Sequence, residues 1–248
     1  MTSWFYVSPA ALQSSPVYLD QENLNHLKAL RLKKGDTLVL SDGQGHAVYG
    51  CLETLQPDSA RISLLEDVAV SSEPPIRIHL YMGITKGDKL DAVVRQCVEL
   101  GARRVIPVLT ERTVVARSAD GWEKKALRWR NIARAAAAQS RRSMIPDVSS
   151  PLHFQEMLLL LKNEELVLVP WEEEKTAALG PILKRSERPP GSLAIFTGPE
   201  GGISPAEMEK LVEIPTIRPV TLGPRILRAE TAPVAALAVI MGYWGDMV

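Results

Sequence analysis

Apolar residues in the first part of the chain come in short runs separated by polar turns. Residues 20–30 form an amphipathic pattern typical of a short helix, and the Asp42-Gly43 pair is a turn signal. Short strands at this spacing predict a small β-barrel. The strands are expected at residues 4–7, 37–40, 48–55 and 60–65.

From residue 76 the pattern changes to apolar runs that alternate with helical stretches. The runs lack strict alternation, which is typical of strands buried on both faces of a parallel sheet. Strands and helices in alternation predict an α/β domain. The strands are expected at 76–82, 105–109, 166–169, 193–196 and 217–222, and the helices at 88–100, 122–140, 154–161, 205–212 and 229–243.

The two patterns meet at residues 70–75, where two prolines follow small polar residues. This composition resists helix and favours an extended linker. We therefore expect two domains, residues 1–72 and residues 73–248. No apolar run approaches the length of about 18 residues that spans a bilayer, and the N-terminus lacks a signal-peptide pattern. The chain is expected to be cytoplasmic.

Net charge is zero, yet its distribution is uneven. Residues 103–142 hold eleven Lys or Arg against three acids, which suits a phosphate backbone, although a solvated helix surface would look the same. Residues 1–72 hold five basic and eight acidic residues, so an RNA contact there would be local, through Arg31, Lys33 and Lys34, or that basic turn is simply a surface feature.

The sequence lacks the motifs of several common classes of nucleotide-binding and catalytic site. The chain has no phosphate-binding P-loop string, no dinucleotide-binding G-x-G-x-x-G after a strand and no G-x-S-x-G elbow. Its four histidines are scattered, so no metal site is expected. Cys51 and Cys97 are expected to be buried thiols.

Two apolar runs each end in Gly-Pro, in the stretches 193–204 and 221–232. We expect their loops to meet at the carboxyl ends of neighbouring parallel strands, the edge where ligands bind in open α/β sheets. The glycines of residues 198–202 let backbone approach a ligand, although a tight turn would use them equally. Glu200 is expected either to line this site or to cap the helix that begins near Ser204.

The strings Thr197-Gly-Pro-Glu-Gly-Gly-Ile-Ser204 and Leu222-Gly-Pro-Arg-Ile-Leu-Arg-Ala-Glu-Thr-Ala232 resemble the paired motifs of the RsmE branch of SPOUT methyltransferases. Residues 86–89 with 96–102, residues 129–146, and residues 30–36 resemble further segments of that family. The departures are Gln96-Cys97 and the alanine run 135–138, which stand where the family has a lysine and a more polar helix.

The resemblance implies a fold, a reaction and a cofactor. The fold would be an N-terminal PUA-like, RNA-binding β-barrel followed by a SPOUT domain with a parallel sheet and a trefoil knot, in a homodimer. The reaction would be methylation of N3 of a uridine in 16S ribosomal RNA by S-adenosylmethionine. The alternatives are a SPOUT methyltransferase acting on another RNA, or a non-catalytic RNA-binding or ribosome assembly factor.

The resemblance also implies which residues act. Uridine N3 carries a proton, so methylation needs a base or a cation that stabilises the anion. Arg228 would hold the uracil anion or a phosphate, and Glu230 would orient Arg228 or accept the proton, unless the two form only an ion pair. Cofactor contacts are expected from Val169, Pro170, Thr197, Gly198, Pro199, Gly201, Gly202, Leu222, Gly223, Ile226 and Leu227. RNA contacts are expected from Arg31, Arg134, Gln139, Arg141 and Arg142.

Overall fold

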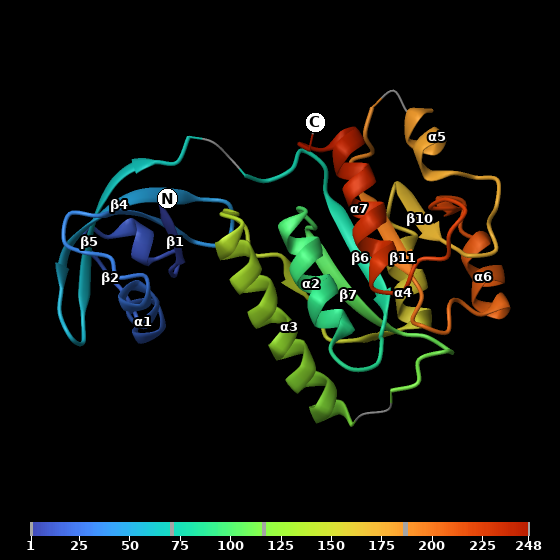
Figure 1. Cartoon of the computed structure of the whole chain (residues 1–248), viewed down its shortest axis with the longest axis horizontal. Coiled ribbons are helices and arrows are strands. Elements are labelled where there is room, and N and C mark those ends of the chain that lie inside the picture. The colour runs from blue at the N-terminus through green and yellow to red at the C-terminus, as the bar shows by residue number, and fades with distance from the viewer. Residues whose placement is uncertain (1, 70–71, 116–117, 186–187, 248) are drawn as a thin grey trace. The chain divides into compact units, whose positions relative to one another are not determined.

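A computed structural model describes residues 2–69, 72–115, 118–185 and 188–247 (Figure 1). The chain folds into two compact units, Met1–Glu73 with Ala137–Ile145, and Pro74–Ala136 with Pro146–Val248. Residues 70 and 71 of the expected linker, and Arg117 of the basic stretch, lie outside the described residues. Within the part of the chain described, no helix is long and apolar enough to cross a membrane.

The first unit is built on a five-stranded sheet with the order β1-β3-β4-β5-β2. Two register irregularities between β4 and β5 bend these strands, as β-bulges do. Leu24 and Leu27 of the helix Gln21–Ala29 pack with Leu38, Leu40 and Leu52 from the strands, and these residues form part of the core of the first unit. The elements are β1 (Ser3–Tyr6), η1 (Ala11–Gln13), β2 (Val17–Tyr18), α1 (Gln21–Ala29), β3 (Thr37–Ser41), β4 (Ala47–Leu55) and β5 (Ala60–Asp67).

The segment Ala137–Ile145 returns to this first unit. The Tyr6 hydroxyl donates to the Arg142 carbonyl at 2.7 Å, and the Ser41 hydroxyl donates to the Ser143 carbonyl at 3.0 Å. The amide of Ile145 donates to the carbonyl of Gly43. These long-range bonds join residues 137–145 to the first unit, although the local pattern of residues places that segment in the second domain.

The second unit is organised around a parallel sheet with the order β12-β10-β11-β6-β7-β8, and β9 also pairs with β7. Its strands are β6 (Ile78–Gly83), β7 (Arg104–Leu109), β8 (Asp147–Val148), β9 (Leu152–His153), β10 (Leu166–Pro170), β11 (Leu193–Thr197) and β12 (Ile217–Val220). Its helices are α2 (Lys89–Glu99), α3 (Ala119–Gln139), α4 (Phe154–Leu161), α5 (Leu179–Lys184), α6 (Pro205–Val212) and α7 (Thr231–Trp244). The residues 137–139 that end α3 belong to the first unit.

The strand order corrects one expectation from the sequence. The strands that precede the two Gly-Pro loops, β11 and β12, are not neighbours, because β10 pairs with both of them in parallel. Consecutive parallel strands are joined by crossover connections, which can pass over another strand of the sheet. Here the connection from β11 to β12 passes over β10, which precedes both in the chain. The five long strands and five long helices of this unit otherwise match their predicted places to within a few residues, whereas the short α5, β8 and β9 have no clear apolar signal.

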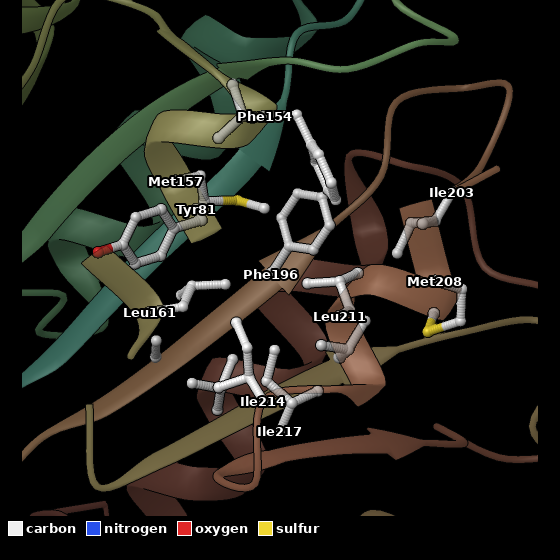
Figure 2. Packing of buried hydrophobic residues seen from close by; sticks show 14 of the residues in the cluster. Tyr81, Phe154, Met157, Leu161, Phe196, Ile203, Met208, Leu211, Ile214 and Ile217 are labelled. Carbon is white, nitrogen blue, oxygen red and sulfur yellow. The ribbon is translucent and has the colours of Figure 1, made fainter. Parts of the chain in front are cut away.

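One face of the parallel sheet packs on α4 and α6 (Figure 2). The strand residues in this core alternate along the chain, which puts them on a common face. Phe196 of β11 lies among them with its ring centroid 6.3 Å from that of Phe154 in α4. Elsewhere in the sheet, α7 contacts β10 and β11 and also packs against α2. Cys97 of α2 is buried, but Cys51 of β4 is only half-buried, so the expectation of a buried thiol is confirmed for Cys97 alone.

Truncation of Phe196 tests this core. Because its side chain is fully buried, Phe196→Ala should lower the free energy of unfolding by about 3–5 kcal/mol. Leu159 lies on α4 with 64% of its surface exposed, so Leu159→Ala should change stability by less than about 0.5 kcal/mol. Urea unfolding of both variants measures the difference. Equal losses would contradict the packing of Figure 2.

Candidate functional site

A cavity of about 530 Å³ opens beyond the carboxyl ends of β10, β11 and β12, beside the start of α7. Its volume is that of a small-molecule site, and its position at the carboxyl edge of a parallel sheet is the one expected for a ligand. The lining residues are Lys89, Pro170, Trp171, Glu172, Lys175, Thr197, Gly198, Pro199, Glu200, Gly202, Ile203, all residues from Thr221 to Glu230, and Ala232.

The loop after β11 folds tightly on itself. The amide of Gly202 donates to the carbonyl of Pro199 at 2.9 Å, and Gly202 has a φ of +73°, which favours glycine. A Cβ on Gly198 would lie 2.8 Å from the backbone of Gly202, and one on Gly202 would lie 2.4 Å from Glu172 Oε1. The backbone contact requires glycine at position 198, and the positive φ favours glycine at position 202.

The loop is held from outside by residues that follow β7. Arg112 Nη1 donates to the carbonyl of Gly201 at 2.7 Å. The amide of Glu111 donates to Glu207 Oε1 at 2.9 Å, and the Ser204 hydroxyl donates to Glu111 at 2.5 Å. These contacts hold the glycine loop and the start of α6 against the segment that follows β7.

The cap of α6 corrects one interpretation of Glu200. Ser204 is the N-cap residue, and it forms a reciprocal capping box with Glu207. Glu200 instead turns back toward α2, where its Oε1 accepts from the amide of Lys86 at 3.1 Å and from Lys89 Nζ at 3.0 Å. The expectation that Glu200 caps this helix is therefore wrong.

Lys89 joins two of the cavity loops electrostatically. Its ammonium lies 3.0 Å from Glu200 Oε1 and 3.7 Å from Glu230 Oε2. The hydrogen bond from Lys89 to Glu200 raises the pKa of the Lys89 ammonium. Burial works to raise the pKa of Glu200, but the Lys89 and backbone hydrogen bonds outweigh it and lower that pKa. Both groups are charged at neutral pH.

Three buried polar atoms on the cavity residues have no hydrogen-bond partner within the described chain. They are Thr197 Oγ1, Trp171 Nε1 and Glu230 Oε2. Thr197 is only 2% exposed, at the end of β11. Buried polar atoms are normally paired, so these atoms are suited to a ligand with both donors and acceptors.

The loop after β12 is more open. The hydroxyl of Thr221 accepts from the amide of Gly223 and donates to its carbonyl, which forms a compact turn at a glycine with φ +114°. Beyond it, Arg225 and Arg228 are exposed, and 85% of the surface of Ile226 is exposed. Glu230 is the N-cap residue of α7, and its side chain is 26% exposed. This loop therefore places the side chains of Arg225, Arg228 and Glu230 at the cavity.

Most of the residues predicted for cofactor contact and catalysis line the cavity together. Two do not. The side chain of Val169 is fully buried in the core beside α4 and α6, and Gly201 lies outside the lining, against the side chain of Arg112. The predicted residues that line the cavity are Pro170, Thr197, Gly198, Pro199, Gly202, Leu222, Gly223, Ile226, Leu227, Arg228 and Glu230.

Sequence reasoning missed the role of Lys89. It lies in the quoted segment 86–89, but no local feature connects that segment to loops more than a hundred residues later. Glu172 and Lys175 were also missed, although they lie in the loop after β10. The end of that predicted strand could have indicated them, because ligands bind at the carboxyl ends of parallel strands.

The predicted RNA contacts fall into two groups. Arg31, Gln139 and Arg141 are exposed in the first unit, and Arg134 is half-buried on α3. Arg142 is only 3% exposed, with Nη2 2.6 Å from Glu73 Oε2. A guanidinium enclosed in an ion pair is not available to RNA, so the structure contradicts the prediction for Arg142.

The net positive charge of residues 103–142 is partly cancelled in the folded protein. Carboxylates from outside residues 103–142 neutralise part of it. Lys125 and Arg128 pair with Asp88, and Arg128 also pairs with Asp91, while Arg104 pairs with Asp147. A count of charges along the chain therefore overstates the basic surface.

Comparison with known proteins defines the class. A family model described as an RNA methyltransferase domain matches residues 72–241, and another, described as an RNA methyltransferase PUA domain, matches residues 19–65. The chain belongs to this RNA methyltransferase family, as its motifs indicated.

The similarity extends to particular members. The chain is 37% identical to the ribosomal RNA small subunit methyltransferase E of Synechocystis sp., over 94% of this chain and 75% of that protein. It is 34% identical to the Bacillus subtilis protein of the same name, over 92% and 91% of the two chains.

Solved structures agree with these similarities. A ribosomal RNA small subunit methyltransferase E from Neisseria gonorrhoeae, bound to S-adenosylmethionine, aligns over 100% of both chains with a TM-score of 0.89 and 31% identity. A putative methyltransferase from Legionella pneumophila, in complex with the same cofactor, covers 99% of both chains with a TM-score of 0.85 and 28% identity.

The contrast between Arg142 and Arg141 can be tested. Arg142→Gln leaves Glu73 largely buried without its cation, so the free energy of unfolding should fall by about 3–5 kcal/mol. Arg141 is exposed, and Arg141→Gln should cost less than about 0.5 kcal/mol. Urea unfolding followed by fluorescence measures both. A small effect of Arg142→Gln would restore Arg142 as a candidate for RNA contact.

Proposed function

We propose that this protein methylates N3 of a uridine in 16S ribosomal RNA, with S-adenosylmethionine as the methyl donor. The observation that carries the proposal is the cavity at the carboxyl edge of β10, β11 and β12, in a chain with close structural similarity to a methyltransferase bound to that cofactor. The curated relatives named for methylation of small-subunit ribosomal RNA support the choice of substrate.

The residues present fit the cofactor. S-adenosylmethionine carries hydroxyl, amine, carboxylate and heterocyclic groups, which can pair with the unpartnered Thr197 and Trp171 atoms and with the loop backbone. Gly198 and Gly202 line the cavity without side chains, so backbone groups of the loop are open to a ligand there. Thr197, Gly198, Gly202, Leu222 and Leu227 would hold it, and the cofactor would supply an electrophilic methyl group on a sulfonium.

Arg228 and Glu230 perform the chemistry in this proposal. The proton of uridine N3 passes to the Glu230 carboxylate, and Arg228 stabilises the negative charge that develops on the uracil. Bound S-adenosylmethionine would supply the methyl group to N3 and leave as the neutral thioether, and Glu230 would release its proton to water. The cavity holds the two reactants in line, which supplies much of the rate.

RNA contacts outside the cavity are assigned to Arg31, Arg134, Gln139 and Arg141. The exposed guanidinium groups of Arg31 and Arg141 suit phosphates, and the Gln139 amide suits a base edge or a sugar hydroxyl. A base that is paired in helical RNA would have to leave its stack to reach the cavity. Salt sensitivity of binding is expected from these contacts.

The finer architecture is part of the same proposal. The domains are a PUA-like, RNA-binding barrel over residues 1–72 and a SPOUT domain over residues 73–248, which the family matches support. A trefoil knot in the SPOUT domain is proposed from the resemblance of the two loop motifs to that family. A homodimer is proposed from the same family resemblance, and a ribosomal RNA substrate supports a cytoplasmic location.

Nucleoside mass spectrometry tests the reaction. Small-subunit ribosomal RNA from cells that lack this protein should lose 3-methyluridine, and expression of the wild-type chain should restore it. An unchanged nucleoside profile would contradict the proposed substrate. In that case, S-adenosylmethionine binding by calorimetry separates the alternatives: binding points to another RNA, and no binding by folded protein points to a non-catalytic RNA-binding or assembly factor.

Substitution tests the catalytic assignment. Arg228→Ala should lower kcat by about 10²–10³-fold, because it removes a charge that stabilises the transition state, while the affinity for S-adenosylmethionine is kept. Arg188 is exposed and outside the cavity, so Arg188→Ala is the matched control. Single-turnover methyl transfer to ribosomal RNA measures kcat, and calorimetry measures affinity. An undiminished kcat in Arg228→Ala would show that another group stabilises the uracil.

A further inference from the structure

The ammonium of Lys89 has donor capacity that its contacts within the described chain do not use. It donates to Glu200 at 3.0 Å, while Glu230 Oε2 at 3.7 Å is beyond hydrogen-bond range. An ammonium carries three N–H donors, so two remain beside the cavity. Glu230 Oε2 in turn is buried and accepts no hydrogen bond from the described residues. The Lys89 ammonium, whose side chain is 38% exposed, thus lies beside a buried carboxylate oxygen that accepts no hydrogen bond from the described residues.

The edge of uracil that is methylated has the complementary pattern. Its N3–H donor lies between two carbonyl oxygens, O2 and O4, which are acceptors. Recognition of this edge therefore requires an acceptor flanked by two donors. Lys89, Glu230 and Arg228 all line the cavity, and Arg228 is near enough to Lys89 for its charge to oppose the protonation of Lys89. Together they offer two donors and one acceptor.

We propose that Lys89 is a substrate-binding residue that donates a hydrogen bond to one carbonyl oxygen of the target uracil, while Glu230 faces N3–H and Arg228 faces the other oxygen. This inference rests on the proposed methylation of uridine N3, and it assigns the specificity for uracil to three side chains. Cytosine presents a lone pair at N3 and an amino donor at C4, so it would place an acceptor against Glu230 and a donor against a cation.

The assignment also resolves a chemical difficulty. Uridine N3–H is a much weaker acid than a carboxylic acid, so Glu230 alone would be a poor base. The negative charge of deprotonated uracil is shared by O2 and O4, and a cation at each oxygen stabilises the anion. Lys89 remains protonated for this purpose, because the hydrogen bond to Glu200 raises its pKa.

The fold holds Lys89 in a fixed position. Lys89 is the first residue of α2, and Asp91 in the same turn accepts from Trp129 Nε1 of α3 at 2.9 Å. Asp88 pairs with Lys125 of α3 at 3.3 Å. On the cavity side, Glu200 ties the segment to the glycine loop through the amide of Lys86. A donor held by such surrounding contacts is pre-organised for its substrate.

Four variants test the proposal. Lys89→Met removes the donor and keeps most of the side-chain length, and Lys89→Arg keeps a cation. Lys86→Met is the matched control, because it removes a neighbouring charge outside the cavity lining and keeps the backbone amide that Glu200 accepts. Glu200→Gln weakens the tether of Lys89 and leaves its ammonium in place. Thermal melting verifies that each variant is folded.

The measurements are kcat against pH for methyl transfer to ribosomal RNA from cells lacking the protein, and calorimetric affinity for S-adenosylmethionine. Lys89→Met should lower kcat at neutral pH by about 10–100-fold, with a smaller loss of cofactor affinity. Its kcat should reach a plateau at higher pH than that of the wild type, since the uracil anion is less stabilised. Lys89→Arg should recover part of the rate, and Lys86→Met should behave as the wild type.

Three outcomes would overturn the inference. The first is a wild-type rate and pH profile in Lys89→Met. The second is an equal loss at every pH, which would indicate a structural role. The third is Glu200→Gln matching Lys89→Met in every measurement, which would mean that Lys89 acts only through Glu200. Absence of methyl transfer by the wild-type protein would instead refute the proposed function itself, so the two failures are distinguishable.

Discussion

The site depends on one pairing arrangement, the insertion of β10 between β11 and β12. Each pair is parallel, so all three strands end at the same edge of the sheet, and the loops that follow them enclose one cavity. These loops follow strands that end at residues 170, 197 and 220. Because β10 is the middle strand, the loop that follows it lies between the glycine loop and the Arg228 loop. Backbone hydrogen bonding in the sheet is therefore what assembles the chemistry.

Around that edge, several side-chain contacts hold the loops in place. Arg112 holds the carbonyl of Gly201, the Ser204–Glu207 capping box fixes the start of α6, and Lys89 links Glu200 to Glu230. Among the residues that line the cavity, Thr197, Trp171 and Glu230 each carry a buried polar atom without a hydrogen-bond partner in the described chain. A site with rigid support and unpaired polar atoms can bind a polar ligand with little reorganisation.

The distribution of charge in the folded protein differs from the distribution along the sequence. Residues 103–142 are strongly basic, but Asp88, Asp91, Asp147 and Glu73 come from elsewhere in the chain to pair with some of those cations. Arg141 and Arg142 are adjacent in sequence, yet one is exposed and the other is buried against Glu73. Burial and pairing depend on distant contacts, so a charge count could not separate a phosphate-binding arginine from a structural one.

The sequence by itself determined the class of fold, the main strands and helices, the family, and the two loops that line the cavity. These features follow from local apolar periodicity and from short motifs whose residues are close together in the chain. Only the tertiary structure decided that β10 separates β11 from β12, that residues 137–145 join the first unit, that Val169 is core, and that Lys89 reaches Glu200 and Glu230. Each of these depends on contacts between residues far apart in sequence, for which a local pattern carries no signal.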